Sequence, residues 1–413
     1  MPKRPLDHTP ASAPSATSAA SAVLPPPPDL PTPLLANLTP SEFMRRYWQK
    51  KPLLVRQAVP GIAPPLARDE LFALAASDDA EARLITHFRG AWRLAHGPFE
   101  PDQIPSVRRR EWTLLVQGVD LHDDRARALL DRFRFAPDAR LDDLMISYAT
   151  DGGGVGPHFD SYDVFLLQVQ GKRRWRISAQ KDLSLKDGLP LKVLQRFEPE
   201  QEWVLEPGDM LYLPPHIAHD GVALGECMTC SIGFRSPSAR ELIGQFLYHL
   251  AERGSVAQQA REDDRYRDPR QDAVKHPARL PDGLIEQVGA ILAGIRWSER
   301  DIVSFLGSYL GEPKAHVVFE APERPANEAA FVKKALRHGV RLDRKTTLLY
   351  GKDSYFLNGE EDRLPRSKKW LLELADARRL EGKRFVTLSA DSSMTALLHE
   401  WYLAGWVRIG ASA

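Results

Sequence analysis

The most constraining feature of this sequence is a succession of short β-rich segments between about residues 84 and 235, separated by Gly, Pro and Asp. Branched aliphatic and aromatic residues dominate these segments, and the residues between them favour turns. Many short strands separated by turn residues are typical of an antiparallel barrel or jelly roll. The predicted strands include Leu144–Ala149, Val164–Val169, Arg173–Ser178, Gln201–Leu205, Met210–Leu213 and Met228–Phe234.

The region before the strands has two parts. Residues 1–36 are rich in Pro, Ala and Ser, and such a composition buries too little apolar surface to offset the entropy of ordering, so we expect a disordered tail. Order should begin at Thr39-Pro40-Ser41-Glu42. There Thr39 and Glu42 can form a capping box around a proline at the first helical position.

The region after the strands is predicted to be mostly helical. Leucine and phenylalanine recur at helical spacing from Ser236 onwards, which predicts a helical module over residues 237–325. Residues 326–413 alternate helices with one hairpin around Gly351, a pattern that suggests a winged-helix-like domain. The jelly roll is therefore predicted to occupy residues 37–236.

The composition excludes several classes of protein. A net charge of +1 gives no reason to expect direct nucleic-acid binding, which needs a marked basic excess. No segment has the length of apolar residues that a membrane span requires, so we expect no membrane contact. Two cysteines in 413 residues rule out a disulfide scaffold and favour a cytoplasmic location.

The two cysteines form the pattern Cys227-Met-Thr-Cys230. A zinc site would need a second pair of Cys or His ligands, and a redox site would need a helix that starts behind a strand. Here the surrounding residues predict a strand, in which positions three apart face opposite sides. We therefore interpret both cysteines as structural.

The segment richest in chemistry runs from Gly152 to Asp160 and reads Gly-Gly-Gly-Val-Gly-Pro-His-Phe-Asp. In extended backbone, residues two apart project from the same face, so His158 and Asp160 can bind one metal ion. A third ligand can come from the histidines that follow a second turn segment, and we favour His219 over His216, which lies directly on a diproline corner. Two histidines and one carboxylate with open coordination positions form the facial triad of non-haem iron(II) oxygenases, which admits a co-substrate and dioxygen.

A 2-oxoglutarate-dependent enzyme also needs a cation for the distal carboxylate of its co-substrate. In the segment Gly-Lys-Arg-Arg-Trp-Arg-Ile, alternation places Arg173 on the same face as Trp175 and Ile177, the apolar and therefore inward face. A buried guanidinium requires an anionic partner, and its fork matches a carboxylate. A structural salt bridge is the alternative interpretation. Ser147 and Ser231, on strands beside the site, are candidate hydroxyl contacts.

Three motifs together resemble those of the bacterial JmjC ribosomal oxygenases. They are Gly-Gly-Gly-Val-Gly-Pro-His-x-Asp, Tyr-Asp-Val-Phe followed by Gly-Lys-Arg-Arg-Trp, and Pro-Gly-Asp-x-x-Tyr-x-Pro-Pro followed by His. The resemblance implies an α+β chain, with a double-stranded β-helix (cupin/JmjC jelly roll) followed by a helical dimerisation module and a winged-helix-like domain. The N-terminal tail is no part of the pattern, and the family often has another residue at the position of His216.

The resemblance also implies an activity. The reaction is hydroxylation at C3 of an arginine in the sixteenth protein of the large ribosomal subunit, with Fe(2+), 2-oxoglutarate and O2. Iron is implied at His158, Asp160 and His219, and 2-oxoglutarate at Arg173 with Ser147, while Asp151 would receive the substrate guanidinium and the chain would form a homodimer. Asp151 as a cap of the turn before the glycines is the simpler interpretation. Another substrate, or a non-catalytic metal-binding scaffold, remains an alternative.

Overall fold

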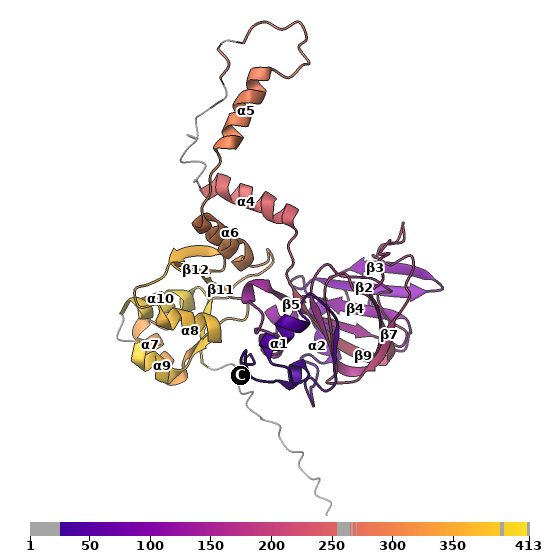
Figure 1. The fold of residues 1–413 in the computed structure, drawn as a ribbon. Coiled ribbons are helices and arrows are strands. Elements are labelled where there is room, and N and C mark those ends of the chain that lie inside the picture. Colours follow the sequence, from indigo (N-terminus) through magenta and orange to yellow (C-terminus); the bar gives the residue numbers. More distant parts are fainter. Residues whose placement is uncertain (1–24, 254–264, 266, 270, 389–391, 411–413) are drawn as a thin grey trace, which may run out of the picture.

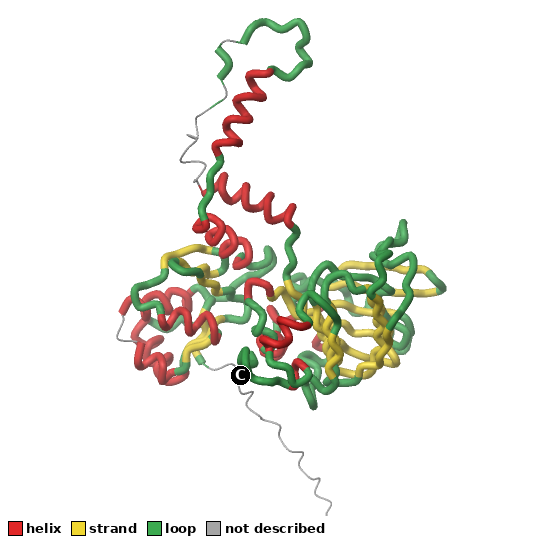
Figure 2. Tube along the Cα trace, in the orientation of Figure 1, coloured by secondary structure: helices red, strands yellow, loops and turns green. Residues whose placement is uncertain are grey.

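The computed structural model describes residues 25–253, 265, 267–269, 271–388 and 392–410. Figure 1 shows two bodies side by side, with helices projecting above them, and Figure 2 shows that the strands gather mainly in one of the two bodies. The predicted disordered tail lies partly outside the described residues. Its last residues contradict the prediction, because Pro33–Leu35 forms a 3-10 turn in which Leu35 is completely buried.

The first helix forms as its capping residues predict. In α1 (Pro40–Arg46), the Thr39 hydroxyl accepts from the Glu42 N–H at 3.0 Å, and the Glu42 carboxylate accepts from the Thr39 N–H at 3.0 Å. Phe43 is fully buried, and its ring packs edge-on against Tyr212 with centroids 5.0 Å apart. The capping box therefore sets the start of a helix that packs against the sheet.

One antiparallel sheet forms the catalytic body. Its strand order is β1-β8-β6-β9-β5-β4-β2-β3, with β7 paired to β6. The strands are β1 (Leu53–Val55), β2 (Ala82–Phe88), β3 (Ala91–His96), β4 (Trp112–Val116), β5 (Leu141–Ala149), β6 (Val164–Ser178), β7 (Gln201–Leu205), β8 (Met210–Leu213) and β9 (Ala218–Phe234). The helices of this body are α1, α2 (Arg68–Ala75) and α3 (Asp124–Asp131), with short 3-10 turns η1 (Pro33–Leu35), η2 (Val119–Leu121) and η3 (Asp138–Arg140).

Two long strands correct the sequence prediction. The segments predicted as separate strands, 164–169 and 173–178, form one strand, β6, which continues through Gly171 at φ +63°. Likewise β9 begins at Ala218, ten residues before the predicted start. Both strands change partners along their length. The second half of β9 pairs with both β5 and β6, whereas its first half pairs with β6 alone. The irregularities between Gln168 and Lys172 allow this change.

The two faces of the sheet have different chemistry. One face packs with the N-terminal helices in a large apolar core that includes Leu114, Ile146, Phe165 and Met228. The opposite face lines the inside of the roll, and it includes a smaller cluster around Trp175, Ile177 and Leu205. Buried polar residues lie among the strands as well, including Ser147, Gln168, Arg173, Thr229 and Ser231.

The cysteines lie on β9, where alternation places them on opposite faces. Cys230 belongs to the large core, whereas Cys227 packs with Ala149 and Ala223 in a separate small cluster. Both are buried free thiols, and burial raises the pKa of Cys230. These buried positions agree with the interpretation that both cysteines are structural.

The C-terminal half begins with helices that leave the catalytic body. Figure 1 shows α4 (Ala239–Arg253) and α5 (Asp282–Gly294) projecting from the molecule, with α5 standing clear of both bodies. By contrast, α6 (Glu299–Gly311) packs on the C-terminal hairpin, where a Cβ at Gly307 would collide with the Phe356 ring. The predicted helical module of residues 237–325 includes α6 together with the projecting helices, and its boundary between residues 325 and 326 stays a prediction.

The second body contains small antiparallel sheets among helices. One sheet has the order β14-β10-β15, and the other is the three-stranded β11-β12-β13. Within the described residues, three helices follow the hairpin. The elements are α7 (Glu328–His338), β10 (Val340–Leu342), β11 (Leu348–Tyr350), β12 (Ser354–Leu357), β13 (Glu360–Arg363), α8 (Lys369–Ala377), β14 (Arg379–Leu380), α9 (Gly382–Leu388), α10 (Ser392–Leu403) and β15 (Val407–Ile409).

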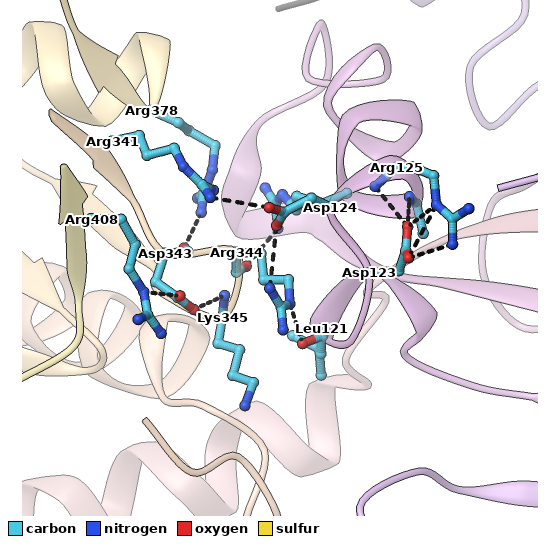
Figure 3. Close-up of polar contacts among 12 residues, drawn as sticks. Leu121, Asp123, Asp124, Arg125, Arg341, Asp343, Arg344, Lys345, Arg378 and Arg408 are labelled. Atoms are coloured by element: carbon cyan, nitrogen blue, oxygen red, sulfur yellow. Dashed lines mark hydrogen bonds and ion pairs between the residues drawn. The ribbon is translucent and has the colours of Figure 1, made fainter. Parts of the chain in front are cut away.

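Charged residues join the two bodies, as Figure 3 shows. Asp124, at the start of α3, accepts from Arg341 Nη2 at 3.0 Å and Arg344 Nη1 at 3.3 Å. Arg344 also donates to the Leu121 carbonyl at 2.9 Å. These half-buried bonds hold the C-terminal body against α3. Within the described residues, no helix is both long and apolar enough to cross a bilayer.

Candidate metal centre and carboxylate site

Three side chains meet at one end of β9. The ligand atoms of His158, Asp160 and His219 lie within 4.8 Å of one another. The backbones of the two histidines exchange hydrogen bonds of 2.9 and 2.7 Å, although His158 belongs to no regular strand. His219 Nε2 lies 3.6 Å from Asp160 Oδ2. The backbone pairing therefore brings together two segments that are distant in the sequence.

The histidine rings are held with one nitrogen free. His158 Nδ1 lies 2.9 Å from the Gly156 carbonyl, and His219 Nδ1 lies 2.9 Å from the Ile217 carbonyl. A carbonyl only accepts, so each Nδ1 carries a proton, and in the neutral form of either ring Nε2 has a free lone pair. Burial and the neighbouring His158 lower the pKa of His219 to about 4. The ring is neutral near pH 7, which is the form that binds metals.

The structure separates the two histidines that competed for the third position. His216 is exposed, has a left-handed backbone at φ +66°, and approaches Phe159 with ring centroids 5.8 Å apart. Only its backbone N–H reaches the cluster, by donating to the Asp160 carbonyl at 2.8 Å. His219, with 2% exposure, is the histidine in the cluster.

The glycines before His158 allow two backbone segments to approach closely. The Gly152 N–H donates to the Ala223 carbonyl at 3.0 Å, and the Ala223 N–H donates to the Gly153 carbonyl at 2.9 Å. A Cβ on Gly154 would lie 2.6 Å from the Gly221 carbonyl oxygen. A Cβ on Gly153 would lie 2.4 Å from the Trp112 carbonyl oxygen. Any other residue at these positions would push the loop that carries His158 away from β9.

Arg173 faces the inside of the roll, as strand alternation predicts. It is 5% exposed, beside Trp175 (5%) and Ile177 (2%), whereas Arg174 is only half-buried. Arg173 Nη1 donates to Ser147 Oγ at 3.0 Å. Its Nε and Nη2 are buried without a hydrogen-bond partner, and no carboxylate among the described residues forms a salt bridge with it. Such a guanidinium fits a carboxylate ligand.

Of the two predicted serines, only Ser147 contacts Arg173 by a hydrogen bond. Ser231 is 8% exposed and lies opposite Met145 of β5. Thr229 lies directly opposite Ser147, and its hydroxyl donates to Gln168 at 2.8 Å. Thr229 and Gln168 were not predicted as site residues, because a lone polar residue in a strand does not show whether its face is the inner one.

Asp151 is not part of the metal-ligand cluster. Its Oδ1 accepts from the Gly225 N–H at 2.9 Å, and its Oδ2 lies 2.7 Å from Arg110 Nη2. Six positions of β9 separate Gly225 from His219, which corresponds to about 20 Å of extended strand. The carboxylate thus braces the loop before the glycines, and its predicted contact with a substrate stays a prediction.

Comparison with known proteins identifies the family. Residues 128–242 match the JmjC domain, and residues 294–408 match the ROXA-like winged helix. The chain is 34% identical over 363 residues to ribosomal protein uL16 3-hydroxylase of Escherichia coli (strain K12), a match that covers 86% of this chain and 94% of that protein. The chain belongs to the JmjC ribosomal oxygenase family.

Other members of the ribosomal oxygenase family agree. The chain is 37% identical over 212 residues to a probable ribosomal oxygenase of Haemophilus influenzae, covering 50% of this chain and 52% of that protein. An X-ray structure of Escherichia coli YcfD matches with a TM-score of 0.76 and 31% identity, over 90% of this chain and 98% of that one. A YcfD complex with cobalt and 2-oxoglutarate matches with a TM-score of 0.75 and 30% identity, over 91% and 99%. The predicted family and fold class are confirmed.

Proposed function

We propose that this chain is an iron(II)- and 2-oxoglutarate-dependent oxygenase that uses dioxygen to hydroxylate C3 of an arginine in ribosomal protein uL16. One observation carries the proposal: a cluster of two imidazoles and a carboxylate shares its roll with a buried guanidinium that has no anionic partner among the described residues. The similarity to a uL16 3-hydroxylase and to YcfD bound to cobalt and 2-oxoglutarate supports it.

His158, Asp160 and His219 would hold the iron. Their donor set fits a non-haem iron site, because the three ligands leave other coordination positions open. The Gly156 and Ile217 carbonyls orient the imidazoles through Nδ1, an arrangement common around metal-binding histidines. When bound, iron and 2-oxoglutarate would allow dioxygen to act as the oxidant, with one oxygen atom entering a C–H bond and the other entering succinate as 2-oxoglutarate loses CO2.

Arg173 would bind the distal carboxylate of 2-oxoglutarate. Its unpartnered Nε and Nη2 can form a bidentate pair with a carboxylate, while the Ser147 hydroxyl holds Nη1 in place. Buried Trp175 and Leu205 keep water from this pair, which strengthens it. Ser231 would provide a further hydroxyl near the co-substrate.

Asp151 is proposed to receive the guanidinium of the substrate arginine. The Arg110 salt bridge demonstrates that this carboxylate accepts a guanidinium, so a substrate would have to displace Arg110. On the native enzyme, an arginine peptide should be hydroxylated in preference to its lysine variant, and Asp151→Asn should reduce that preference. Equal hydroxylation of both peptides by the native enzyme would contradict this role.

A homodimer is proposed to form through the projecting helices. Their exposed apolar side chains have no cover within the described part of the chain: Ile243, Leu247 and Tyr248 on α4, and Ile285, Val288, Ile291 and Leu292 on α5. Two-fold dimers are the commonest assembly, and a second copy would bury these faces. We also infer action in the cytoplasm, without direct binding to nucleic acid.

The decisive experiment incubates the iron(II)-loaded chain with 2-oxoglutarate, oxygen and purified uL16. We expect succinate to form and one arginine-containing uL16 peptide to gain the mass of one oxygen atom in tandem mass spectrometry. Asp160→Ala should abolish both products. If the native chain forms neither product, or modifies a different residue type, the proposed function is wrong.

A further inference from the structure

A cavity of about 70 Å³ lies where the two bodies meet. One wall comes from α3, the start of β5 and the residue after β9, and the opposite wall comes from Arg378 and residues between 344 and 348 of the C-terminal body. The segment that follows α6 closes a third side. None of the residues that line the cavity belongs to the metal-ligand cluster or to the carboxylate site around Arg173.

The side chains around this cavity carry more positive than negative charge. Six of them are cations and four are carboxylates. The cations are Arg127, Arg235, Lys314, Arg344, Lys345 and Arg378. Four of the six have an acidic neighbour, in the pairs Arg127–Asp131, Arg344–Asp124, Arg235–Asp142 and Lys314–Asp142. Two of these pairs share the Asp142 carboxylate, so the acidic residues do not match the cations one to one.

The other two cations, Arg378 and Lys345, have only backbone partners. Arg378 Nη2 donates to the Asp343 carbonyl at 2.8 Å (Figure 3) and to the Thr346 carbonyl at 3.0 Å. Lys345 Nζ donates to the Val318 carbonyl at 2.9 Å. Neither side chain forms a salt bridge in the described part of the chain. A carbonyl accepts a hydrogen bond but carries no net charge, so both positive charges are left without an anion.

The surroundings of Arg378 also favour an additional anion. Burial, together with the neighbouring guanidiniums of Arg127 and Arg134, lowers the pKa of Arg378 to about 9, although Asp131 opposes this shift. The side chain is still charged near pH 7, among other cations. Burial also raises the pKa of Asp120, a carboxylate in the same wall, and so favours its neutral form. An anion in the cavity would reduce the repulsion among these cations.

We propose that the cavity binds a phosphate dianion, either as inorganic phosphate or as the phosphate group of a small phosphate ester, with Arg378 and Lys345 as its ligands. The cavity has room for an ion of this size, and two unpaired cations match its two charges. A guanidinium binds phosphate through two parallel hydrogen bonds, and a lysine adds a point charge. The bound ion would lie between the two bodies and would stabilise their contact.

Calorimetry on the metal-free full chain tests the site, because phosphate also binds free metal ions. Inorganic phosphate and adenosine monophosphate are titrated separately at constant ionic strength. Saturable binding of one phosphate group per chain is expected. Arg378→Met and Lys345→Met should each weaken it about 10- to 100-fold, as expected for lost charge-assisted bonds. Arg366→Met and Lys352→Met, at exposed positions of the same body, should leave it unchanged.

The outcomes separate this site from its rivals. A native chain that shows no saturable phosphate binding below about 10 mM overturns the proposal, because the cations would then serve only to hold the bodies together. Binding that is lost in Arg173→Met but kept in Arg378→Met would place phosphate in the carboxylate site instead, and would also overturn it. Tighter binding of adenosine monophosphate would identify the ligand as a phosphate ester, and tighter binding of inorganic phosphate would identify it as the free ion.

Thermal unfolding separates ligand binding from a structural role. Arg378 also holds two carbonyls of its own body, so its replacement can loosen the fold. Lys345 contacts only an exposed carbonyl, and Lys345→Met should therefore keep the native unfolding temperature when phosphate is absent. Phosphate should raise the unfolding temperature of the native chain, and it should raise that of Lys345→Met much less. A rise of equal size in Lys345→Met would contradict the proposal.

Discussion

Replacing Asp163 by alanine should destabilise the catalytic body by about 3–5 kcal/mol. Asp163 is completely buried at the start of β6. Its carboxylate accepts from the Tyr212 hydroxyl at 2.7 Å and from Gln49 Nε2 at 2.9 Å, and Arg140 Nη2 lies 3.5 Å away. Alanine would leave these donors without their acceptor.

The magnitude follows from the burial of each group. Each buried polar group left unpaired costs about 1–3 kcal/mol. The Tyr212 hydroxyl is buried and still accepts from the Gln49 N–H at 2.8 Å, so its loss is partial, and Arg140 is 31% exposed and can reach water. Asp163→Asn keeps one acceptor but turns an amide toward donors, so we expect a smaller loss of about 2–3 kcal/mol.

Thermal unfolding of the metal-free chain measures this effect. For a body of 150–250 residues, each kcal/mol corresponds to about 2–4 °C in Tm, so alanine should lower Tm by roughly 6–20 °C. The exposed Asp187→Asn serves as the matched control and should leave Tm unchanged. A loss below about 1 kcal/mol for Asp163→Ala would refute the reasoning, because it would mean that the freed donors find other partners.

Three further predictions concern binding, assembly and pH. Iron(II) binding, measured by anaerobic titration, should be lost in His219→Ala and kept in His216→Ala. The reverse result would show that His216, and not His219, is the third metal ligand. Ile291→Asp on exposed α5 should convert a dimer into a monomer in light scattering, whereas a native chain that is already monomeric would exclude the proposed interface. Burial raises the pKa of Asp143 from 3.8 to about 6, opposed by Lys314, so the folded state holds this proton more tightly than the unfolded state. Protonated Asp143 therefore stabilises the folded state. This contribution to the free energy of unfolding is complete below about pH 4 and falls by up to about 3 kcal/mol as the pH rises through 6. Asp143→Asn should flatten this fall in stability, measured by denaturant unfolding across pH 4–7, and exposed Asp142→Asn should not; identical pH profiles for Asp143→Asn and the native chain would contradict the prediction.

Local signals in the sequence predicted local structure well. The Thr39–Glu42 capping box forms with both hydrogen bonds. Alternation around Trp175 was sufficient to predict that Arg173 points inward, because one strand of consistent pattern determines its own two faces.

Features that depend on pairing between distant segments could not be predicted in this way. The strands β2, β3 and β4 were not individually predicted, and the register that aligns β2 and β4 with β5 depends on pairing that no single strand reveals. The salt bridge between Arg110 and Asp151 joins residues that flank the paired ends of β4 and β5, strands that are distant in the sequence. The left-handed backbone that turns His216 outward is likewise invisible in the sequence, since any residue can occupy that corner at a cost.

Most residues of the motifs shared with the family are not metal ligands, and several of them hold the backbone around the site. In the Tyr-Asp-Val-Phe motif, Asp163 accepts from Tyr212, which is the tyrosine of the Pro-Gly-Asp-x-x-Tyr motif. In the Pro-Gly-Asp-x-x-Tyr motif, Asp209 accepts from the Gln57 and Glu206 N–H groups at 3.0 and 3.1 Å and from Arg56 at 2.6 Å. These carboxylates join the loop after Asp160 to β8 and the N-terminal segment. Because a metal site tolerates little displacement of its ligands, the residues that fix the backbone are as tightly constrained as the ligands themselves.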